Sequence, residues 1–326
     1  MNESNRHDIV IIGAGPAALT AAIYTTREDI DTLLFEKGVV GGLAAVTDVI
    51  DNYPGFSSGV AGLELADSLR KQAERFGAVI ELGEVTGLND EGDYKRLETT
   101  VGDIYARAVL IATGCYYNRT GIPGEDKFYA RGVHFCATCD GAFYRDKRLV
   151  VIGGGNSAIQ ETIFLTRYAS HIDILVRSKI KASNVLVKDL QPFIDQGKVS
   201  IHLGITPKEI IGNDNGVNKV IGTDKEGNSR EFMTDGVFVF IGLKPNSDFL
   251  KNSSVKLDER GFVLTDSNLE TSIQGVFAAG DIRSGATMQI ASASGEGATA
   301  ALKIRKYLEG RLHHDRLETR QFEVIS

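Results

Sequence analysis

Two strand–glycine turn–helix patterns in one chain constrain its fold more than any other feature. The first joins the apolar run 8–12 to the glycine turn 13–18 and a helical stretch. The second repeats this order with residues 148–152 and 153–158. In such a turn one glycine permits a tight bend, the next lets the backbone approach a pyrophosphate, and a small third residue lets the helix pack on the strand. Two complete patterns predict an α/β protein with two Rossmann-like dinucleotide-binding domains.

Further apolar strands indicate where the domains divide. Residues 108–114 and 236–242 are similar apolar strands that end in glycine, and each closes a segment. A third, 275–281, precedes a helix expected over about 288–308. The chain has 326 residues, which suits two domains. We predict a discontinuous first domain and an inserted second domain, with the boundaries 1–117 plus 245–326, and 118–244.

Cysteine is rare in this chain, and two of its three cysteines form a Cys-x-x-Cys pair. Cys136 and Cys139 are followed directly by Asp140. Two thiols at this spacing indicate redox chemistry, because the second thiol makes the first a more reactive thiolate. Asp140 is the candidate acid/base for these thiols, although an Asp before glycine is also typical of a turn or helix cap. Cys115 is expected to be a small buried residue, and His134 a strand or surface residue.

Composition and charge exclude several classes of function. The formal net charge of −7 argues against nucleic-acid binding, which requires concentrated Lys and Arg. No apolar run approaches the roughly 18 residues that a membrane span needs. The polar start of the chain does not resemble a signal peptide, so we expect a cytoplasmic enzyme. The pair His313–His314 lacks the further ligands of a metal site, and no metal is predicted.

The two glycine turns differ in the residue expected to hold a ribose. A dinucleotide fold places an acid at the end of its second strand, about 20 residues beyond the turn. Glu36 occupies this position after the first turn, which suits an adenosine ribose. After the second turn the same position is Val176, which has no hydrogen-bonding side chain. The second nucleotide site is therefore predicted to be incomplete.

An ordered series of motifs along nearly the whole chain strongly resembles the low-molecular-weight thioredoxin reductases. The motifs are GAGPA at 13–17, GG at 41–42, DNYPGF at 51–56, ATG at 112–114, PGE at 123–125, CATCDG at 136–141, GGGNSA at 153–158 and AGD at 279–281. The resemblance implies a two-domain disulfide reductase flavoprotein, a homodimer, whose first domain binds FAD and whose second carries the cysteine pair. It also implies thioredoxin as the partner, with Cys139 facing the flavin and Cys136 attacking the thioredoxin disulfide.

The same resemblance assigns roles at the flavin. Glu36 would hold the adenosine ribose, Asn52 would lie near the flavin and Asp281 would bind the ribityl chain. Gln289 would approach the isoalloxazine ring. The full set of residues that the resemblance places at FAD is Gly13, Gly15, Pro16, Ala17, Glu36, Gly42, Leu43, Asn52, Ala112, Thr113, Gly114, Asp281, Gln289 and Ile290.

Departures from the family pattern bear on the electron donor. NADPH-dependent members carry a His-Arg-Arg run and a further Arg, which bind the 2′-phosphate, where this chain has VRSKIK at 176–181. Only Arg177 is retained in place. A nearby Lys binds a phosphate less well than Arg does, because it lacks the planar fork of donors. Met288 replaces an Arg that belongs to the same pattern. These changes resemble ferredoxin-dependent flavin thioredoxin reductases and deeply rooted thioredoxin reductases, so we expect a donor other than NADPH, such as ferredoxin.

Three alternative functions stay open. One is an NADPH-dependent thioredoxin reductase with a weakened phosphate site. Another is an FAD-dependent dithiol oxidase that passes electrons to oxygen. Such oxidases usually carry Pro after the first Cys, so Ala137 favours the reductase. The third is a flavin redox sensor that signals through its dithiol without turnover.

Overall fold

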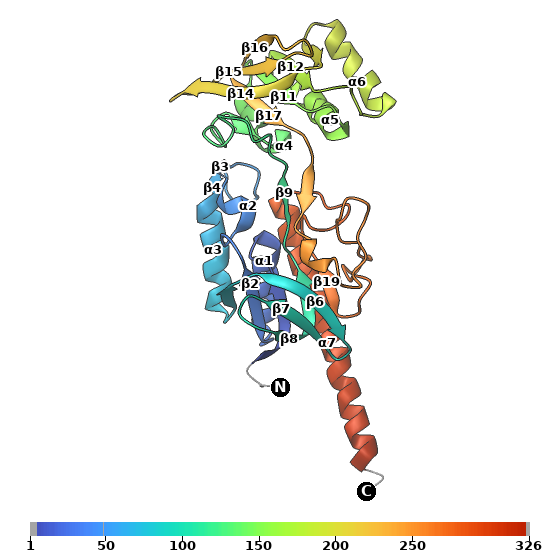
Figure 1. Cartoon of the computed structure of the whole chain (residues 1–326). Helices are drawn as coiled ribbons and strands as arrows, with labels where there is room; N and C mark the ends of the chain where they lie inside the picture. Colours follow the sequence, from blue (N-terminus) through green and yellow to red (C-terminus); the bar gives the residue numbers. More distant parts are fainter. Residues whose placement is uncertain (1–4, 48, 324–326) are drawn as a thin grey trace. The chain divides into compact units, whose positions relative to one another are not determined.

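The computed structural model describes residues 5–47 and 49–323, with side chains as far as Arg311, and forms two compact units. Unit 1 comprises Met1–Tyr116 and Lys244–Ser326, and unit 2 comprises Tyr117–Leu243. The connecting segments β9 (Cys115–Tyr117) and β18 (Leu243–Pro245) pair as a two-stranded sheet. Both units are built on parallel strands with helices (Figure 1), so the predicted α/β fold is confirmed.

Unit 1 contains a seven-stranded sheet in which β1 is central. The order is β5-β2-β1-β8-β7-β6, and β19 pairs with residues 109–111 of β8, beyond the part of β8 that β7 contacts. Strands β5, β2, β1, β8 and β19 are parallel, whereas β7 and β6 continue the sheet as antiparallel strands. The bounds are β1 (Arg6–Ile12), β2 (Thr32–Glu36), β5 (Val79–Leu82), β6 (Val85–Glu91), β7 (Tyr94–Thr99), β8 (Ile104–Ile111) and β19 (Val276–Ala278).

Both faces of this sheet are covered by apolar cores. Side chains alternate along a strand, so Ile9 and Ile11 of β1 enter one core while Val10 and Ile12 enter the other. The apolar helix α1 is largely buried and packs against α3 and α7. The other elements of unit 1 are α1 (Pro16–Thr26), α2 (Gly42–Ala45), β3 (Val49–Ile50), β4 (Val60–Ala61), α3 (Gly62–Arg75), η3 (Asp248–Leu250) and α7 (Ile290–Glu323).

The last helix differs from its predicted bounds of about 288–308. Helix α7 runs Ile290–Glu323. Met288 has a φ of +56°, a left-handed conformation that a helix cannot contain. The helix therefore begins after Met288, and it continues well beyond the predicted end at about 308.

Unit 2 contains a five-stranded parallel sheet in the order β10-β17-β11-β12-β13. A three-stranded antiparallel sheet, β14-β15-β16, forms the rest of the unit's strand structure. The bounds are β10 (Val133–His134), α4 (Ala137–Asp140), η2 (Gly141–Tyr144), β11 (Arg148–Ile152), α5 (Asn156–Leu165), β12 (His171–Val176), α6 (Asn184–Asp195), β13 (Val199–Leu203), β14 (Thr206–Asn213), β15 (Gly216–Thr223), β16 (Ser229–Met233) and β17 (Gly236–Val239).

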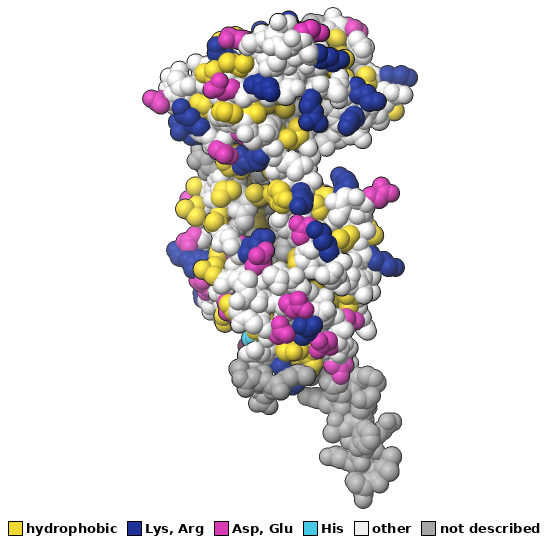
Figure 2. All heavy atoms as spheres, viewed as in Figure 1, with side chains coloured by type: hydrophobic (Ala, Val, Ile, Leu, Met, Phe, Trp, Pro, Cys, Tyr) yellow, Lys and Arg dark blue, Asp and Glu magenta, His cyan; other side chains and the backbone are white. Residues whose placement is uncertain are grey.

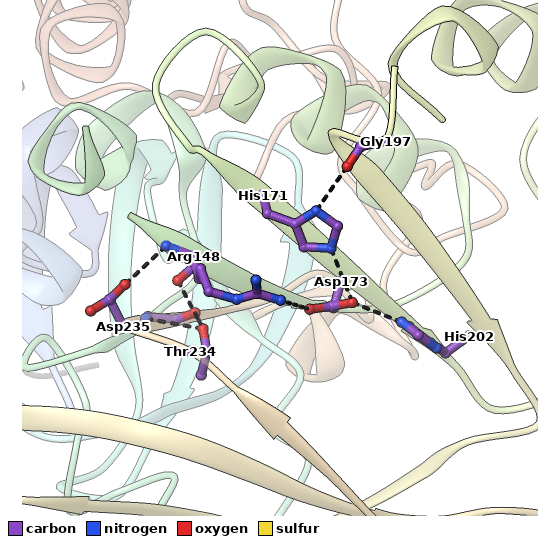
Figure 3. A network of polar contacts seen from close by, with 8 residues as sticks. Arg148, His171, Asp173, Gly197, His202, Thr234 and Asp235 are labelled. Atoms are coloured by element: carbon purple, nitrogen blue, oxygen red, sulfur yellow. Dashed lines mark hydrogen bonds and ion pairs between the residues drawn. The ribbon is translucent and has the colours of Figure 1, made fainter. Parts of the chain in front are cut away.

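A buried carboxylate organises one face of the unit 2 sheet (Figure 3). The Asp173 side chain is only 10% exposed, and its Oδ1 lies 2.8 Å from His202 Nε2 and 3.3 Å from His171 Nε2. Its Oδ2 lies 3.4 Å from an Arg148 guanidinium nitrogen. Burial alone would raise the pKa of Asp173, but the contacts from His202 and His171 outweigh burial and lower it.

Across residues 5–47 and 49–323, no helix is long and apolar enough to cross a membrane. Among the described side chains, no cluster of His, Cys, Asp and Glu is arranged to hold a metal ion. This includes the cluster around Asp173. We therefore interpret the Asp173 cluster as a stabilising polar network.

Replacing Asp173 by Asn should test this interpretation. We expect the free energy of unfolding to fall by about 1–3 kcal/mol at pH 7, because His202 and Arg148 lose a charged partner. The folded-state pKa of Asp173 is lowered. Its contribution is thus complete above the unfolded value of about 3.9 and is lost as the pH falls through the folded value.

Urea denaturation at pH 7 and at about pH 3 measures both effects. Asp189→Asn, on the exposed surface of α6, is the matched control and should change stability by less than about 0.5 kcal/mol. Equal effects of the two substitutions at pH 7 would contradict the interpretation.

Candidate active site

The first glycine turn is closed by backbone contact and by one carboxylate. Gly13 has a φ of +104°, and a Cβ there would lie 2.6 Å from the Ala112 carbonyl oxygen. Pro16 and Ala17 begin α1, and Gly15 is its N-cap without a side-chain cap. These features leave the helix N–H groups accessible to an anion, as a pyrophosphate site requires.

Glu36 lies at the end of β2 and contacts the same turn. Its Oε2 accepts a hydrogen bond from Ala14 N at 2.8 Å, and its Oε1 accepts one from Gly38 N at 2.7 Å. The carboxylate is thereby held beside the turn, where the ribose of a dinucleotide lies in this fold. The position agrees with the role expected of Glu36.

The short helix α2 begins close to the first turn. Gly42 has a φ of +56°, and a Cβ there would lie 3.6 Å from Gly15 Cα. Leu43 follows and is 39% exposed, near the exposed Val46 and Val49. Figure 2 shows hydrophobic side chains gathered over the part of unit 1 that carries α2, β3 and β4. Gly42 is thus brought to the glycine turn from a separate segment, and Leu43 follows it in α2.

Two predicted flavin residues meet although they are far apart in sequence. Asn52 Nδ2 donates to Gln289 Oε1 at 3.1 Å. Ile290 begins α7 and packs against a small apolar cluster that includes Ala44 and Leu65. The chain therefore brings Asn52, Gln289 and Ile290 to one part of unit 1.

The segment after β8 is tied to a residue that the sequence did not single out. Ala112 N donates to the Ile12 carbonyl. Thr113 Oγ1 donates to the Asn246 carbonyl at 2.8 Å, and Asn246 Nδ2 donates back to the Thr113 carbonyl at 2.8 Å. Asn246 N also donates to the Gly114 carbonyl. Asn246 follows Pro245, and an Asn in this loop carried no motif that could have indicated the contact.

Asp281 is the carboxylate predicted to bind the ribityl chain. Burial, with Glu296 nearby, raises the pKa of Asp281 to about 6. Glu296 is itself occupied, since it accepts from Gly280 N at 2.8 Å and from Arg283 at 2.6 Å and 2.9 Å. This environment favours a hydroxyl group that donates a hydrogen bond to Asp281, and it disfavours a further negative charge beside it. Sequence reasoning missed the Arg283–Glu296 pair, because its members lie on different segments and belong to no motif.

The second glycine turn has the same backbone but different chemistry. Gly153 has a φ of +147°, and a Cβ there would overlap the Phe240 carbonyl oxygen. Val176, at the end of β12, is 3% exposed, and its Cγ1 would lie 2.7 Å from a Cβ at Gly154. An aliphatic side chain therefore fills the place that Glu36 occupies in unit 1. The hydrogen-bonding group that a ribose requires is replaced by apolar packing.

The residues that follow Val176 are exposed and cationic. Arg177, Lys179 and Lys181 are exposed, as is Ser178 between them. Figure 2 shows Lys and Arg side chains on the part of unit 2 that carries α5 and α6. The stretch supplies positive charge, but it has only one guanidinium.

The cysteine pair forms a disulfide at the start of α4. Cys136 and Cys139 have Cα atoms 5.4 Å apart and are bonded through their sulfurs. Cys136 is the N-cap of α4, and its Sγ accepts from Cys139 N at 3.1 Å. Cys115 is 4% exposed, and burial raises the pKa of its thiol to about 12. Its predicted role as an inert buried residue agrees with both observations.

Asp140 directs its side chain toward a histidine and caps no helix. It ends α4 and precedes η2, where its side chain makes no cap hydrogen bond. Its Oδ2 lies 3.2 Å from His134 Nδ1. The cap interpretation is therefore wrong. His134 lies on β10 as a strand residue, but it is 8% exposed and is not on the surface.

Comparison with known proteins identifies the family. The model of the pyridine nucleotide-disulphide oxidoreductase family matches residues 7–297. The chain is 42% identical over 311 residues to a thioredoxin reductase of Bacillus subtilis, covering 95% of this chain and 97% of the relative. A thioredoxin reductase structure from Streptococcus pyogenes matches with a TM-score of 0.89 and 37% identity, covering 94% of this chain and 99% of that one. The chain belongs to the thioredoxin reductase family.

Family membership makes the chain a flavoprotein disulfide oxidoreductase, and thioredoxin reductases use FAD. Unit 1 fits this cofactor on its own geometry, because the Gly13–Gly15 turn, the Glu36 carboxylate and the half-buried Asp281 lie on the segments that an extended dinucleotide needs. Each has a chemical counterpart in FAD: the pyrophosphate, the adenosine ribose and the ribityl hydroxyls.

Two neighbouring glycines should respond differently to the same substitution. Gly13→Ala is expected to lower the free energy of unfolding by at least about 2 kcal/mol, because φ is positive and the Cβ would meet the Ala112 carbonyl. Gly15→Ala should leave apoprotein stability nearly unchanged, because nothing lies within 4 Å of a Cβ there. It should instead lower FAD retention, since the Cβ occupies the space that a pyrophosphate approaches.

Urea denaturation of the apoproteins and flavin retention after gel filtration distinguish the two effects. Full FAD retention by a folded Gly15→Ala protein would contradict the assignment of this turn.

Proposed function

We propose that this chain reduces the disulfide of thioredoxin, using FAD held by unit 1 and the Cys136–Cys139 pair of unit 2, with an electron donor other than NADPH. The observation that carries the reductase assignment is the disulfide beside Asp140, in a chain whose relatives are thioredoxin reductases. The observation that carries the donor assignment is the buried Val176 against Gly154.

Bound FAD would supply the electron pair that opens the Cys136–Cys139 disulfide. In unit 1, Glu36 would hold the adenosine ribose through its carboxylate and Asp281 would accept a hydrogen bond from the ribityl chain. Asn52 and Gln289, already hydrogen-bonded to each other, would lie at the isoalloxazine ring with Ile290. Gly42, Leu43 and residues 112–114 would complete the cofactor's surroundings.

Disulfide exchange then follows from the cysteine chemistry. With the pair reduced, the Cys136 thiolate attacks a thioredoxin sulfur, forming a mixed disulfide and releasing one thioredoxin thiol. Cys139 attacks Cys136, re-forming the Cys136–Cys139 disulfide and releasing the second thiol. Two electrons and two protons thus pass from the dithiol to thioredoxin. The hydrogen bond from Cys139 N favours the charged form of Cys136, and Asp140 would exchange the proton with the thiols.

The second glycine turn supports a donor other than NADPH. A 2′-phosphate is bound best by the bidentate fork of Arg, and the exposed run after Val176 offers a single Arg. The apolar contact between Val176 and Gly154 also lacks a ribose acceptor. Reduced ferredoxin is a donor of sufficient reducing power for thioredoxin, whose potential is about −270 mV. Homodimer formation stays a prediction, which the molar mass in solution would test.

Single cysteine substitutions should separate the roles of the two sulfurs. Cys139→Ser should accumulate a mixed disulfide between Cys136 and thioredoxin, because the resolving thiol is missing. Cys136→Ser should form no such complex and should lose thioredoxin reduction by at least about 100-fold. Cys115→Ser is the matched control and should keep wild-type rates, because its thiol is buried. Non-reducing mass spectrometry detects the complex, and a complex that forms through Cys139 alone would reverse the assignment.

The donor assignment can be tested by restoring one arginine. NADPH, NADH and reduced ferredoxin are offered anaerobically to the FAD-loaded protein with thioredoxin present, and flavin absorbance is followed. We expect efficient bleaching by ferredoxin only, and Ser178→Arg should lower KM for NADPH by at least about tenfold through a new phosphate contact. Ser170→Arg, exposed before the other end of β12, is the control and should not.

Each other outcome assigns a different function. Rapid bleaching of the unaltered protein by micromolar NADPH would refute the donor proposal and leave an ordinary NADPH-dependent reductase. Oxygen consumption with a dithiol substrate would indicate a dithiol oxidase. Slow reoxidation, with a binding partner that responds to the state of Cys136, would indicate a redox sensor.

A further inference from the structure

A buried histidine links the redox helix to a tyrosine. His134 lies on β10, and the chain then leads directly into Cys136 and α4. Its Nδ1 is 3.2 Å from Asp140 Oδ2, and its Nε2 is 2.7 Å from the Tyr144 hydroxyl. The side chains of His134 and Asp140 are 8% and 19% exposed. Both nitrogens of one buried imidazole are thus engaged by polar groups that follow the cysteine pair in the chain.

Aromatic packing fixes the plane of this imidazole. The His134 ring stacks on Phe238 of β17 with centroids 5.3 Å apart, and Tyr144 packs edge-on against the His134 ring at the same centroid distance. Phe238 is fully buried and also contacts the Tyr144 ring. Packing between two aromatic partners holds the plane of the ring, and the contacts with Asp140 and Tyr144 set which nitrogen faces each of them.

The chemistry of the neighbours determines which nitrogen carries the proton. Burial, with Asp140 and Asp235 nearby, raises the pKa of Tyr144, so its hydroxyl stays protonated and can donate to Nε2. An ionised Asp140 only accepts hydrogen bonds, and a bare Nδ1 would repel it. The arrangement therefore selects the tautomer with a hydrogen on Nδ1, directed toward the carboxylate.

We propose that His134 is a positioning residue for Asp140: it orients this carboxylate as the proton acceptor and donor of the Cys136–Cys139 pair. The inference rests on the proposed role of Asp140 in disulfide exchange. The Nδ1–H of His134 is directed at Asp140 Oδ2, and the Tyr144 hydroxyl holds the imidazole in that tautomer. When Asp140 takes a proton from a thiol, that thiol becomes the attacking thiolate, and the proton leaves Asp140 for a product thiolate.

The other charged and titratable groups nearby do not replace this contact. Tyr129 interacts electrostatically with Asp140, and Asp235 interacts electrostatically with Tyr144. Arg119 lies over the rings of Tyr129 and Phe135, with its guanidinium carbon 4.3 Å and 4.7 Å from their centroids. Among the side chains that the structure describes, His134 is the one that pairs directly with the Asp140 carboxylate.

The decisive experiment measures the pH profile of the dithiol without donor or thioredoxin. Full-length FAD-loaded protein is reduced with dithiothreitol, separated from it anaerobically and oxidised with the aromatic disulfide DTNB between about pH 4 and 9, a range that spans carboxylate and thiol titration. His134→Phe keeps the ring packing but removes both nitrogens. We expect the acid limb of the rate to move up by about one pH unit, because the Asp140 carboxylate loses its contact with Nδ1.

Three further variants test whether the effect passes through Asp140. His134→Asn, which retains a donor in the position of Nδ1, should restore most of the wild-type profile. Tyr144→Phe, which loses only the hydroxyl, should move the limb in the same direction by less than His134→Phe does. In an Asp140→Asn background, His134→Phe should cause no further shift, because the residue that it positions is gone.

The outcomes separate this inference from the proposed function. A uniform loss of rate without a shift of the limb, or an equal shift with and without Asp140, would overturn the positioning role. If His134→Phe does not fold, the presence or absence of a shift in Tyr144→Phe decides the same question. Because DTNB replaces thioredoxin and dithiothreitol replaces the donor, failure of the protein to reduce thioredoxin would refute the proposed function and leave this profile readable.

Discussion

Both units are built around close backbone contact between a glycine turn and the residue that follows a neighbouring strand. At Gly13 a Cβ would approach the Ala112 carbonyl, and at Gly153 one would overlap the Phe240 carbonyl. Glycine alone tolerates both the positive φ and the approach. Each contact places a helix at the carboxyl end of a central strand, and that helix then packs the core on one sheet face. The same backbone constraint therefore shapes both units, whatever ligand each of them binds.

Because the backbone requirement is shared, the presence of a glycine turn says little about what it binds. The two units differ at one side chain beside the turn: Glu36 accepts a hydrogen bond from Ala14 N, whereas Val176 packs against Gly154. A carboxylate offers acceptors to a ribose, while a valine offers only apolar surface. The second turn can persist because the fold needs it, whether or not a nucleotide binds there. This distinction is why the donor proposal rests on Val176 and the exposed run after it.

The redox pair depends on both local and distant residues. The four-residue helix α4 holds Cys136 and Cys139 at bonding distance and supplies the N–H that contacts Cys136. The acid beside them is instead held by His134 of β10, which Phe238 of β17 keeps in plane. A strand and a short helix thus together position the carboxylate that follows the cysteine pair. Cys115, deeply buried with a raised pKa, stays outside this chemistry.

Residue patterns alone predicted the α/β class, the two glycine turns and the redox chemistry of the cysteine pair. They also predicted the contrast between Glu36 and Val176. These features are local, since they depend on period, spacing and residue type over a few positions. The same patterns did not determine the end of α7, the Asn52–Gln289 and Thr113–Asn246 contacts, or the partner of Asp140. The three contacts follow from the fold, because each joins segments whose proximity depends on sheet order and helix packing, which no local pattern encodes.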